Sequence, residues 1–206
     1  MSKLVSEPMK LIPTALLISV AALLGGCLVS SNPFYDTHAI VQDDRFVGHY
    51  SNDEAQSVWE VTKTGAPPGR YRLILHERGT QSEYAGTLFK IDQSTFLDVF
   101  AEKVADIPRD PGGPPSPGEL LNEFISGRRH VVFRIEVRDD ALTLWVALPN
   151  DLASLLEKEP QLKRGKEKES FLILLEPTKT LQSLLAKYGK DQTLFSEKNV
   201  LAKKKG

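Results

Sequence analysis

Residues 130–147, HVVFRIEVRDDALTLWVA, decide the class of fold. Apolar side chains occupy every second position at 131–137 and again at 142–146, and most of the residues between them are polar. A period of two is typical of β-strands that bury one face. Asp139-Asp140 joins the two runs as a two-residue loop, so the sequence predicts an antiparallel hairpin.

The same alternation extends through much of the chain from residue 46 onward. It is clear at 70–76, where only Ile74 breaks the pattern. Together with the hairpin, the candidates add up to about eight antiparallel strands. The sequence therefore predicts a mainly β fold of the α+β class. The remaining strand candidates are 46–50, 56–62, 84–92, 94–99 and the apolar run SFLILL at 170–175.

Three helices are expected beside these strands. Ser116-Pro117-Gly118-Glu119 has the form of a capping box, and it predicts a short helix over 119–126. A second short helix is expected over 151–157. The third is the most amphipathic and stops near Gly189; we interpret it as a C-terminal helix packed on the sheet. Candidate N-caps of the second and third helices are Asn150 or Asp151, and Thr178 or Thr180.

Composition excludes several classes of protein. The chain has 206 residues and a formal net charge of −1, which argues against a nucleic-acid-binding protein that works through a basic surface. A single cysteine allows neither an intramolecular disulfide nor a cysteine-rich zinc site. The length is sufficient for one domain with a sizeable hydrophobic core.

The amino terminus has the organisation of a secretory signal. Lys3 and Lys10 precede the uncharged stretch LIPTALLISVAALL at 11–24. This stretch is shorter than the roughly 20 apolar residues of a membrane-spanning helix, whereas a signal peptide needs an apolar centre of about 7–15 residues. We therefore expect residues 1–26 to be a signal peptide.

The end of this stretch, Leu24-Gly25-Gly26-Cys27, resembles the lipobox of bacterial lipoproteins. The resemblance implies that Leu24, Gly25 and Gly26 are recognised by a signal peptidase that cuts before Cys27. It also implies that the Cys27 thiol carries a diacylglyceryl group and that the new amino group is acylated, for example with palmitate. The membrane is then a partner through these chains, since two or more chains anchor stably. The alternative is a chance cysteine after an ordinary signal peptide.

A lipidated Cys27 implies a location in the cell envelope. Leu28 follows where an Asp retains enteric lipoproteins in the inner membrane, so an outer-membrane anchor facing the periplasm is expected. The expected organisation is a signal peptide at 1–26, a lipidated tether at 27–45, a β-rich domain at 46–196 and a basic, flexible tail at 197–206. The 180 residues from Cys27 onward carry 24 basic and 26 acidic side chains.

Arg45-Phe46-Val47-Gly48-His49-Tyr50 resembles the F-x-G-x-W opening of lipocalin-type barrels, with Tyr50 in place of the Trp. The resemblance implies a small β-barrel with a helix after the last strand; a flattened sandwich with peripheral helices is the alternative. Aromatic residues that face a barrel interior could line a site for an apolar ligand, but ordinary core packing is the preferred interpretation, because β-structure favours aromatic residues. Those considered are Trp59, Tyr71, Phe89, Phe133 and Trp145, and alternation can place Trp145 on the outer face.

No catalytic motif was found. The sequence has no nucleophile elbow, phosphate loop, dinucleotide fingerprint or HExxH helix. Its four histidines are isolated from one another, so we expect no catalytic residue, no metal site and no cofactor. The expected function is a lipid-anchored envelope module that binds or assists an envelope protein without catalysis. A lipocalin-like carrier or sensor of a small apolar ligand is one alternative, and an envelope hydrolase with a dispersed site is another.

Overall fold

The computed structural model describes residues 27–52, 57–103, 116–125, 128–165, 172–190, 192 and 194–204. The signal-peptide prediction for 1–26, including Leu24, Gly25 and Gly26, lies outside the described residues. The first five strands after Cys27 are β1 (Leu28–Ser30), β2 (Gly48–Asn52), β3 (Ser57–Lys63), β4 (Arg70–Glu77) and β5 (Thr80–Ile91). The next five are β6 (Ser94–Lys103), β7 (His130–Val137), β8 (Ala141–Val146), β9 (Leu172–Leu174) and β10 (Glu197–Lys204). The helices are η3 (Asp44–Phe46), α2 (Pro117–Ile125), α3 (Pro149–Lys158) and α4 (Thr178–Tyr188).

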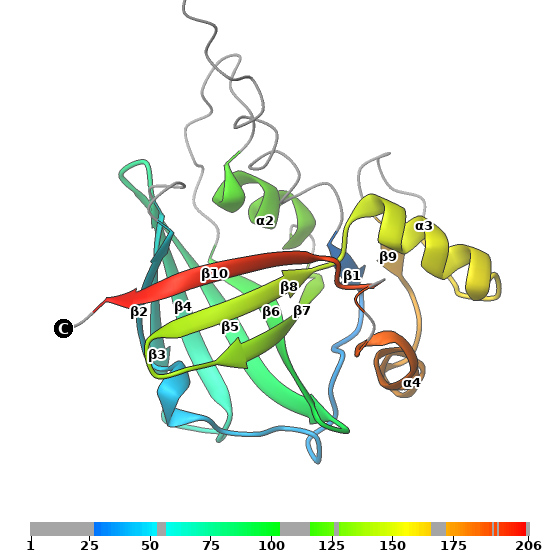
Figure 1. Ribbon diagram of the computed structural model, residues 1–206, viewed down its shortest axis with the longest axis horizontal. Helices are drawn as coiled ribbons and strands as arrows, with labels where there is room; N and C mark the ends of the chain where they lie inside the picture. Colours follow the sequence, from blue (N-terminus) through cyan, green and yellow to red (C-terminus); the bar gives the residue numbers. More distant parts are fainter. Residues whose placement is uncertain are drawn as a thin grey trace, which may run out of the picture.

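Eight antiparallel strands close into a barrel (Figure 1). Strands β2 to β8 follow one another in chain order, and β10 pairs with both β8 and β2 to complete the ring. The mainly β prediction is therefore confirmed in its lipocalin-like barrel form, and the sandwich alternative is wrong.

The prediction of a flexible tail at 197–206 is wrong for the described part of that segment. Residues 197–204 form β10, whose Leu201 is 6% exposed and faces the barrel interior, while Val200 is 53% exposed on the outside. The predicted last helix corresponds to α4, but β10 follows it, so α4 is not the C-terminal element.

The hairpin predicted at 130–147 is confirmed. Strands β7 and β8 pair in register from Val137 and Leu142 to Arg134 and Trp145, and the N–H of Arg138 donates to the carbonyl of Ala141 across the turn. Alternation directs one set of side chains into the barrel, where they form an interior hydrophobic cluster. The opposite set faces outward.

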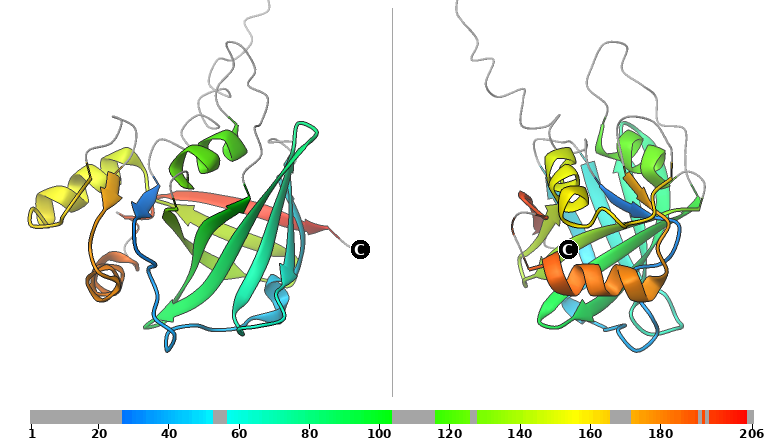
Figure 2. Two further views of the ribbon diagram at one scale, coloured as in Figure 1. Left: turned by 180° about the vertical axis from the view of Figure 1, so that it is seen from behind. Right: turned by 90° about the vertical axis from the view of Figure 1, so that its right-hand side faces the viewer.

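A second hydrophobic cluster lies outside the barrel wall. Leu28 and Val132, cross-strand partners on β1 and β7, pack there together with Phe96 and with leucines of α3 and α4. These helices and β9 lie to one side of the barrel (Figure 2). The prediction of a tether over 27–45 is therefore wrong, because this segment includes a buried strand and Phe34, which is also fully buried.

The three predicted helices are present, but two of them begin earlier than expected. Ser116 forms the predicted capping box with Glu119: its N–H donates to the Glu119 carboxylate at 2.6 Å, and its hydroxyl accepts the Glu119 N–H at 3.3 Å. Helix α3 has Leu148 as its N-cap, with the N–H of Leu148 donated to Asp151, and α4 has Pro177. Among the described residues, no helix has the length and apolar composition needed to cross a membrane.

Replacing Leu201 by Ala tests the role of β10. We expect a loss of about 2–5 kcal/mol in the free energy of unfolding, because the side chain is buried inside the barrel. The matched control Val200→Ala, at the exposed neighbouring position, should cost less than about 1 kcal/mol. Urea unfolding of both variants measures the difference, and equally small losses would argue against a strand at 197–204.

Candidate ligand cavity

The barrel encloses a cavity of about 120 Å³. Side chains from β3, β4, β6, β7, β8 and β10 form its wall, and none of the residues that line it carries a charge. Side-chain polar atoms in the lining come from Cys27, Ser57, Trp59 and Asn199. A cavity with such a lining favours apolar groups over water, since water needs two to four polar partners.

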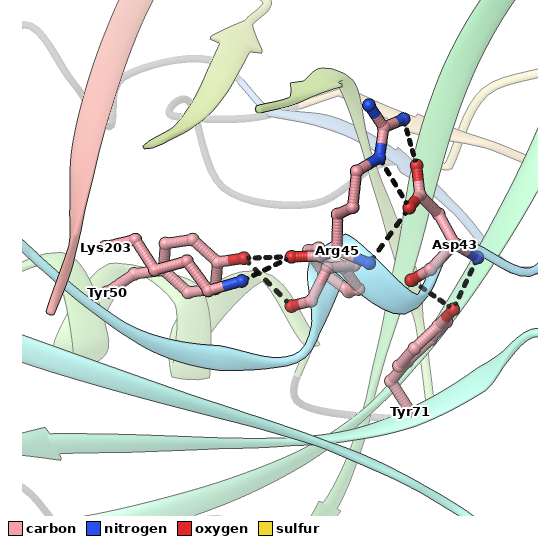
Figure 3. A network of polar contacts seen from close by, with 6 residues as sticks. Asp43, Arg45, Tyr50, Tyr71 and Lys203 are labelled. Carbon is pink, nitrogen blue, oxygen red and sulfur yellow. Dashed lines mark hydrogen bonds and ion pairs between the residues drawn. The ribbon is translucent and has the colours of Figure 1, made fainter. Parts of the chain in front are cut away.

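The end of the cavity beside η3 is closed by Phe46, which is 1% exposed. Its ring packs edge-on against the ring of Tyr71, with the centroids 4.9 Å apart. The Tyr71 hydroxyl accepts the N–H of Asp43 at 2.9 Å and donates to the carbonyl of the same residue at 3.0 Å (Figure 3). These contacts tie the segment that carries Phe46 to β4.

Two further donors hold the same segment from the other side. The Tyr50 hydroxyl lies 3.0 and 3.1 Å from the carbonyl oxygens of Arg45 and Phe46, and the ammonium group of Lys203 donates to the Arg45 carbonyl at 2.7 Å (Figure 3). Burial raises the pKa of Tyr50 to about 12, so the phenol keeps its proton and donates at neutral pH. Tyr50 therefore anchors this end of the barrel with a hydrogen bond.

Helix α2 lies across the opposite end of the barrel (Figures 1 and 2). Its buried Leu121 and Phe124 form part of the cavity lining. The N–H of Gly118 donates to Glu77 of β4 at 2.9 Å, and the Tyr84 hydroxyl of β5 donates to Asn122 at 2.5 Å. Side-chain contacts with the β4–β5 hairpin thus hold α2 over this end.

Glu77 is the buried ionisable group beneath α2. It is 4% exposed, and burial raises the pKa of its carboxyl above the ordinary value, against the smaller lowering effect of the Gly118 N–H. The charged form of Glu77 is therefore disfavoured where α2 meets the barrel.

Cys27 is part of the cavity wall. Its side chain belongs to the interior cluster and is 2% exposed, and burial raises the pKa of its thiol to about 12. In the unmodified chain the thiol is therefore protonated at neutral pH. Because β1 begins at the next residue, Cys27 joins the barrel directly, with no intervening tether.

The five aromatic residues considered from sequence fall in three places. Trp59 and Phe133 line the cavity. Tyr71 belongs to the interior cluster but lies behind Phe46, outside the lining. Phe89 is buried in the cluster outside the barrel, so its inward placement is wrong; the ring of Trp145 is also outside, on the face that alternation allowed for it.

Both side chains lie on the outer face of the barrel wall. Phe89 stacks with Phe96 on the outer face of β5 and β6, at a centroid distance of 5.4 Å. The Trp145 ring lies 4.3 Å below the guanidinium group of Arg134, its cross-strand partner. The short-range pattern at each strand does not tell which face is the interior when both faces are covered.

The histidine with the closest acidic partner is His130. Its Nδ1 lies 2.7 Å from Oδ1 of Asp98, whose other oxygen accepts the N–H of Phe34 at 3.0 Å. The pair thus links β6 and β7 to the segment that follows β1. Within the part of the chain that the structure describes, no three His, Cys, Asp or Glu side chains are arranged to hold a metal ion.

Several lining residues were missed from sequence. Phe46, Leu121 and Phe124 close the two ends, and Cys27 was considered only as a lipidation site. The apolar stripe of α2 was visible in the sequence, but its position across the barrel depends on contacts with strands far along the chain. Comparison with models of protein families, with curated proteins and with solved structures found no match.

Replacing Glu77 by Gln tests how α2 is held. A carboxyl whose pKa is raised in the folded state makes the folded protein less stable as the pH rises. The loss begins near the ordinary pKa of 4.5 and continues until the pH has passed the raised pKa. The amide of the Glu77→Gln variant does not titrate, so the stability of the variant lacks this contribution to the pH dependence. The test therefore compares the free energies of unfolding of the two proteins at each pH.

Relative to the wild type, the Glu77→Gln protein should become more stable as the pH rises through this window. Urea unfolding from about pH 4 to about pH 7 measures this difference. A difference that stays constant with pH would contradict the buried, disfavoured charge.

Proposed function

We propose that this protein is a lipid-anchored binding module of the bacterial cell envelope, and that its barrel holds a small apolar ligand. The observation that carries the proposal is the uncharged cavity enclosed by the barrel. Its lining matches the usual composition of small-molecule sites, which are mostly apolar with a few polar groups.

The amino-terminal sequence supports the anchored part of the proposal. An uncharged 14-residue stretch ends in Leu24-Gly25-Gly26-Cys27, the form of a bacterial lipobox. Acyl chains on the thiol and the amino group of Cys27 would hold the protein at the membrane, since two or more chains anchor stably. Leu28 at the following position favours the outer membrane facing the periplasm.

The two ends of the barrel support the ligand-binding part. Phe46 closes one end through hydrogen bonds that fix its backbone, while α2 covers the other end with side chains. An apolar interior covered at both ends favours an apolar occupant over water, and filling it gains about 25 cal/mol per Å² of apolar surface removed from water. The barrel thus offers a preformed site.

Cys27→Ser in the full chain tests the anchor. In the bacterial host the variant should lack acyl chains and should keep residues 1–26, because the peptidase acts on the lipidated cysteine. The matched control Ser31→Ala, at an exposed position, should be acylated and cut like the wild type. Intact-mass analysis of membrane and soluble fractions decides. A Cys27→Ser protein that is cut before residue 27 and still partitions with membranes would contradict the lipoprotein assignment.

Val61→Phe tests the cavity. The added ring fills the space next to β3, so benzene, a compact apolar probe, should bind at least about tenfold more weakly, ~1.4 kcal/mol. Val200→Phe makes the same change on the exposed face of β10 and should leave binding unchanged. Calorimetric titration of the chain 27–206 with Cys27→Ser measures both. Equal binding by the two variants would place the probe outside the barrel.

A further inference from the structure

The residues that line the cavity extend along the barrel. Its lining includes three successive inward positions on β3, Ser57, Trp59 and Val61, and three on β8 from Leu142 to Val146. Five residues of a strand span about 13 Å between their first and last Cα atoms, and a strand tilt near 40° reduces this to about 10 Å along the barrel axis. A volume of about 120 Å³ distributed over this length leaves a thin channel.

A thin channel selects the shape of its occupant. A compact cavity of about 150 Å³ holds a benzene ring. The smaller volume seen here, extended along the barrel, fits a single alkyl chain better than a ring. An extended alkyl chain advances about 1.3 Å per bond, so a length of about 10 Å corresponds to about eight carbons.

The two ends of the channel are covered in different ways. At η3, the backbone around Phe46 is fixed by the hydroxyl groups of Tyr50 and Tyr71 and by the ammonium group of Lys203 (Figure 3). At the other end, the apolar side chains of α2 cover the channel. The uncharged lining requires a charged or strongly polar head group to remain outside. The α2 end is therefore the end at which a head group can stay in contact with solvent or membrane.

Cys27 lies at this same end. Strand β1 pairs with one edge of β7 from His130 to Val132, and β8 pairs with the same edge from Arg134 onward. Leu28 is opposite Val132, so Cys27 is located where β1 and β8 meet along β7, and its side chain borders the channel. Acyl chains attached to Cys27 would therefore start at the wall of the cavity.

We propose that the cavity takes one saturated acyl chain, which enters at the α2 end beside Cys27. This inference rests on the proposed function and names its ligand. The chain comes either from the lipid on Cys27 itself or from a neighbouring membrane lipid. Both sources present the same alkyl group, and the anchor holds the α2 end of the barrel against the bilayer in either case.

The energetics are consistent with either source. Two chains are sufficient for stable anchoring, so a cysteine that carries three can place one in the barrel. A chain already attached beside the cavity binds intramolecularly, at a high effective concentration. An acyl chain longer than the cavity displaces Leu121 and Phe124 of α2, because the covered cavity holds only part of such a chain.

The ligand class is tested with a chain that has one tryptophan. The protein has two, and Trp145→Phe removes the one outside the barrel, leaving Trp59 in the cavity wall. The chain 27–206, which includes both hydrophobic clusters and every barrel strand, is made with Cys27→Ser and first tested for cooperative melting. It is then titrated with saturated primary alcohols of increasing length that carry bromine, a short-range quencher, near the methyl end.

Quenching of Trp59 should be saturable, and affinity should rise about fourfold per added methylene up to about eight carbons and then level off. Val61→Phe should remove this quenching, with Val99→Phe as a second variant that fills the same cavity. Trp59→Phe, which keeps Trp145 outside, should show no saturable quenching. The two cavity-filling variants make the result independent of whether either one folds poorly.

The source is tested with the lipidated protein carrying Trp145→Phe in vesicles of brominated phospholipid. Quenching of Trp59 identifies a chain from the surrounding lipid. If brominated lipid does not quench Trp59 and the brominated alcohols no longer bind, the cavity is occupied by the chain on Cys27. Each result supports the acyl-chain proposal and selects one source.

The proposal is overturned if the alcohols do not quench Trp59 in the unlipidated chain, if affinity does not depend on chain length, or if both cavity-filling variants bind as the wild type does. Binding of benzene in the same preparation would show that the proposed function survives and only the ligand class is wrong. Failure of both ligands would remove the ligand-binding part of the proposed function as well.

Discussion

The structure depends on the pairing of β10 with two partners. Residues 197–202 pair with β8 and residues 202–204 pair with β2, so one strand joins the two edges of an otherwise open sheet. Closure satisfies the backbone groups that both edges would expose, and it completes the wall around the cavity. Without β10, Leu201 and Asn199 would be missing from that wall, and β2 and β8 would each have a free edge.

The mainly β class and the 130–147 hairpin could be predicted because their signal is local. Alternation and a two-residue turn both act within about 20 residues of chain. Strand β10 was missed because it buries little: Leu201 is its one buried residue, and its lysines resemble those of a solvated end. Its conformation is fixed by partners more than 50 residues away in the chain, a distance over which a local pattern carries no information.

The same distinction applies to the cavity. Trp59 and Phe133 could be identified because aromatic residues in alternating strands often face a barrel interior, but Phe89 and Trp145 show that the outer face can be covered as well. The outer cluster with α3 and α4 makes both faces of the barrel wall partly apolar, which weakens the alternation of apolar and polar residues along the strands. The contribution of Cys27 follows only from the pairing of β1 with β7, which no short-range signal in the sequence indicates.

The direction of β10 shows which end of the barrel lies away from Cys27. It begins beside Val146, near Cys27 and α2, and runs to Lys203 and Lys204 beside η3. If the anchor is at Cys27, the barrel stands on the bilayer with its axis fixed, and the surface it extends into the periplasm is the η3 end. That end carries Asp43, Arg45, Lys203 and Lys204, so an anchored molecule would present these charged side chains on the side that faces away from the membrane.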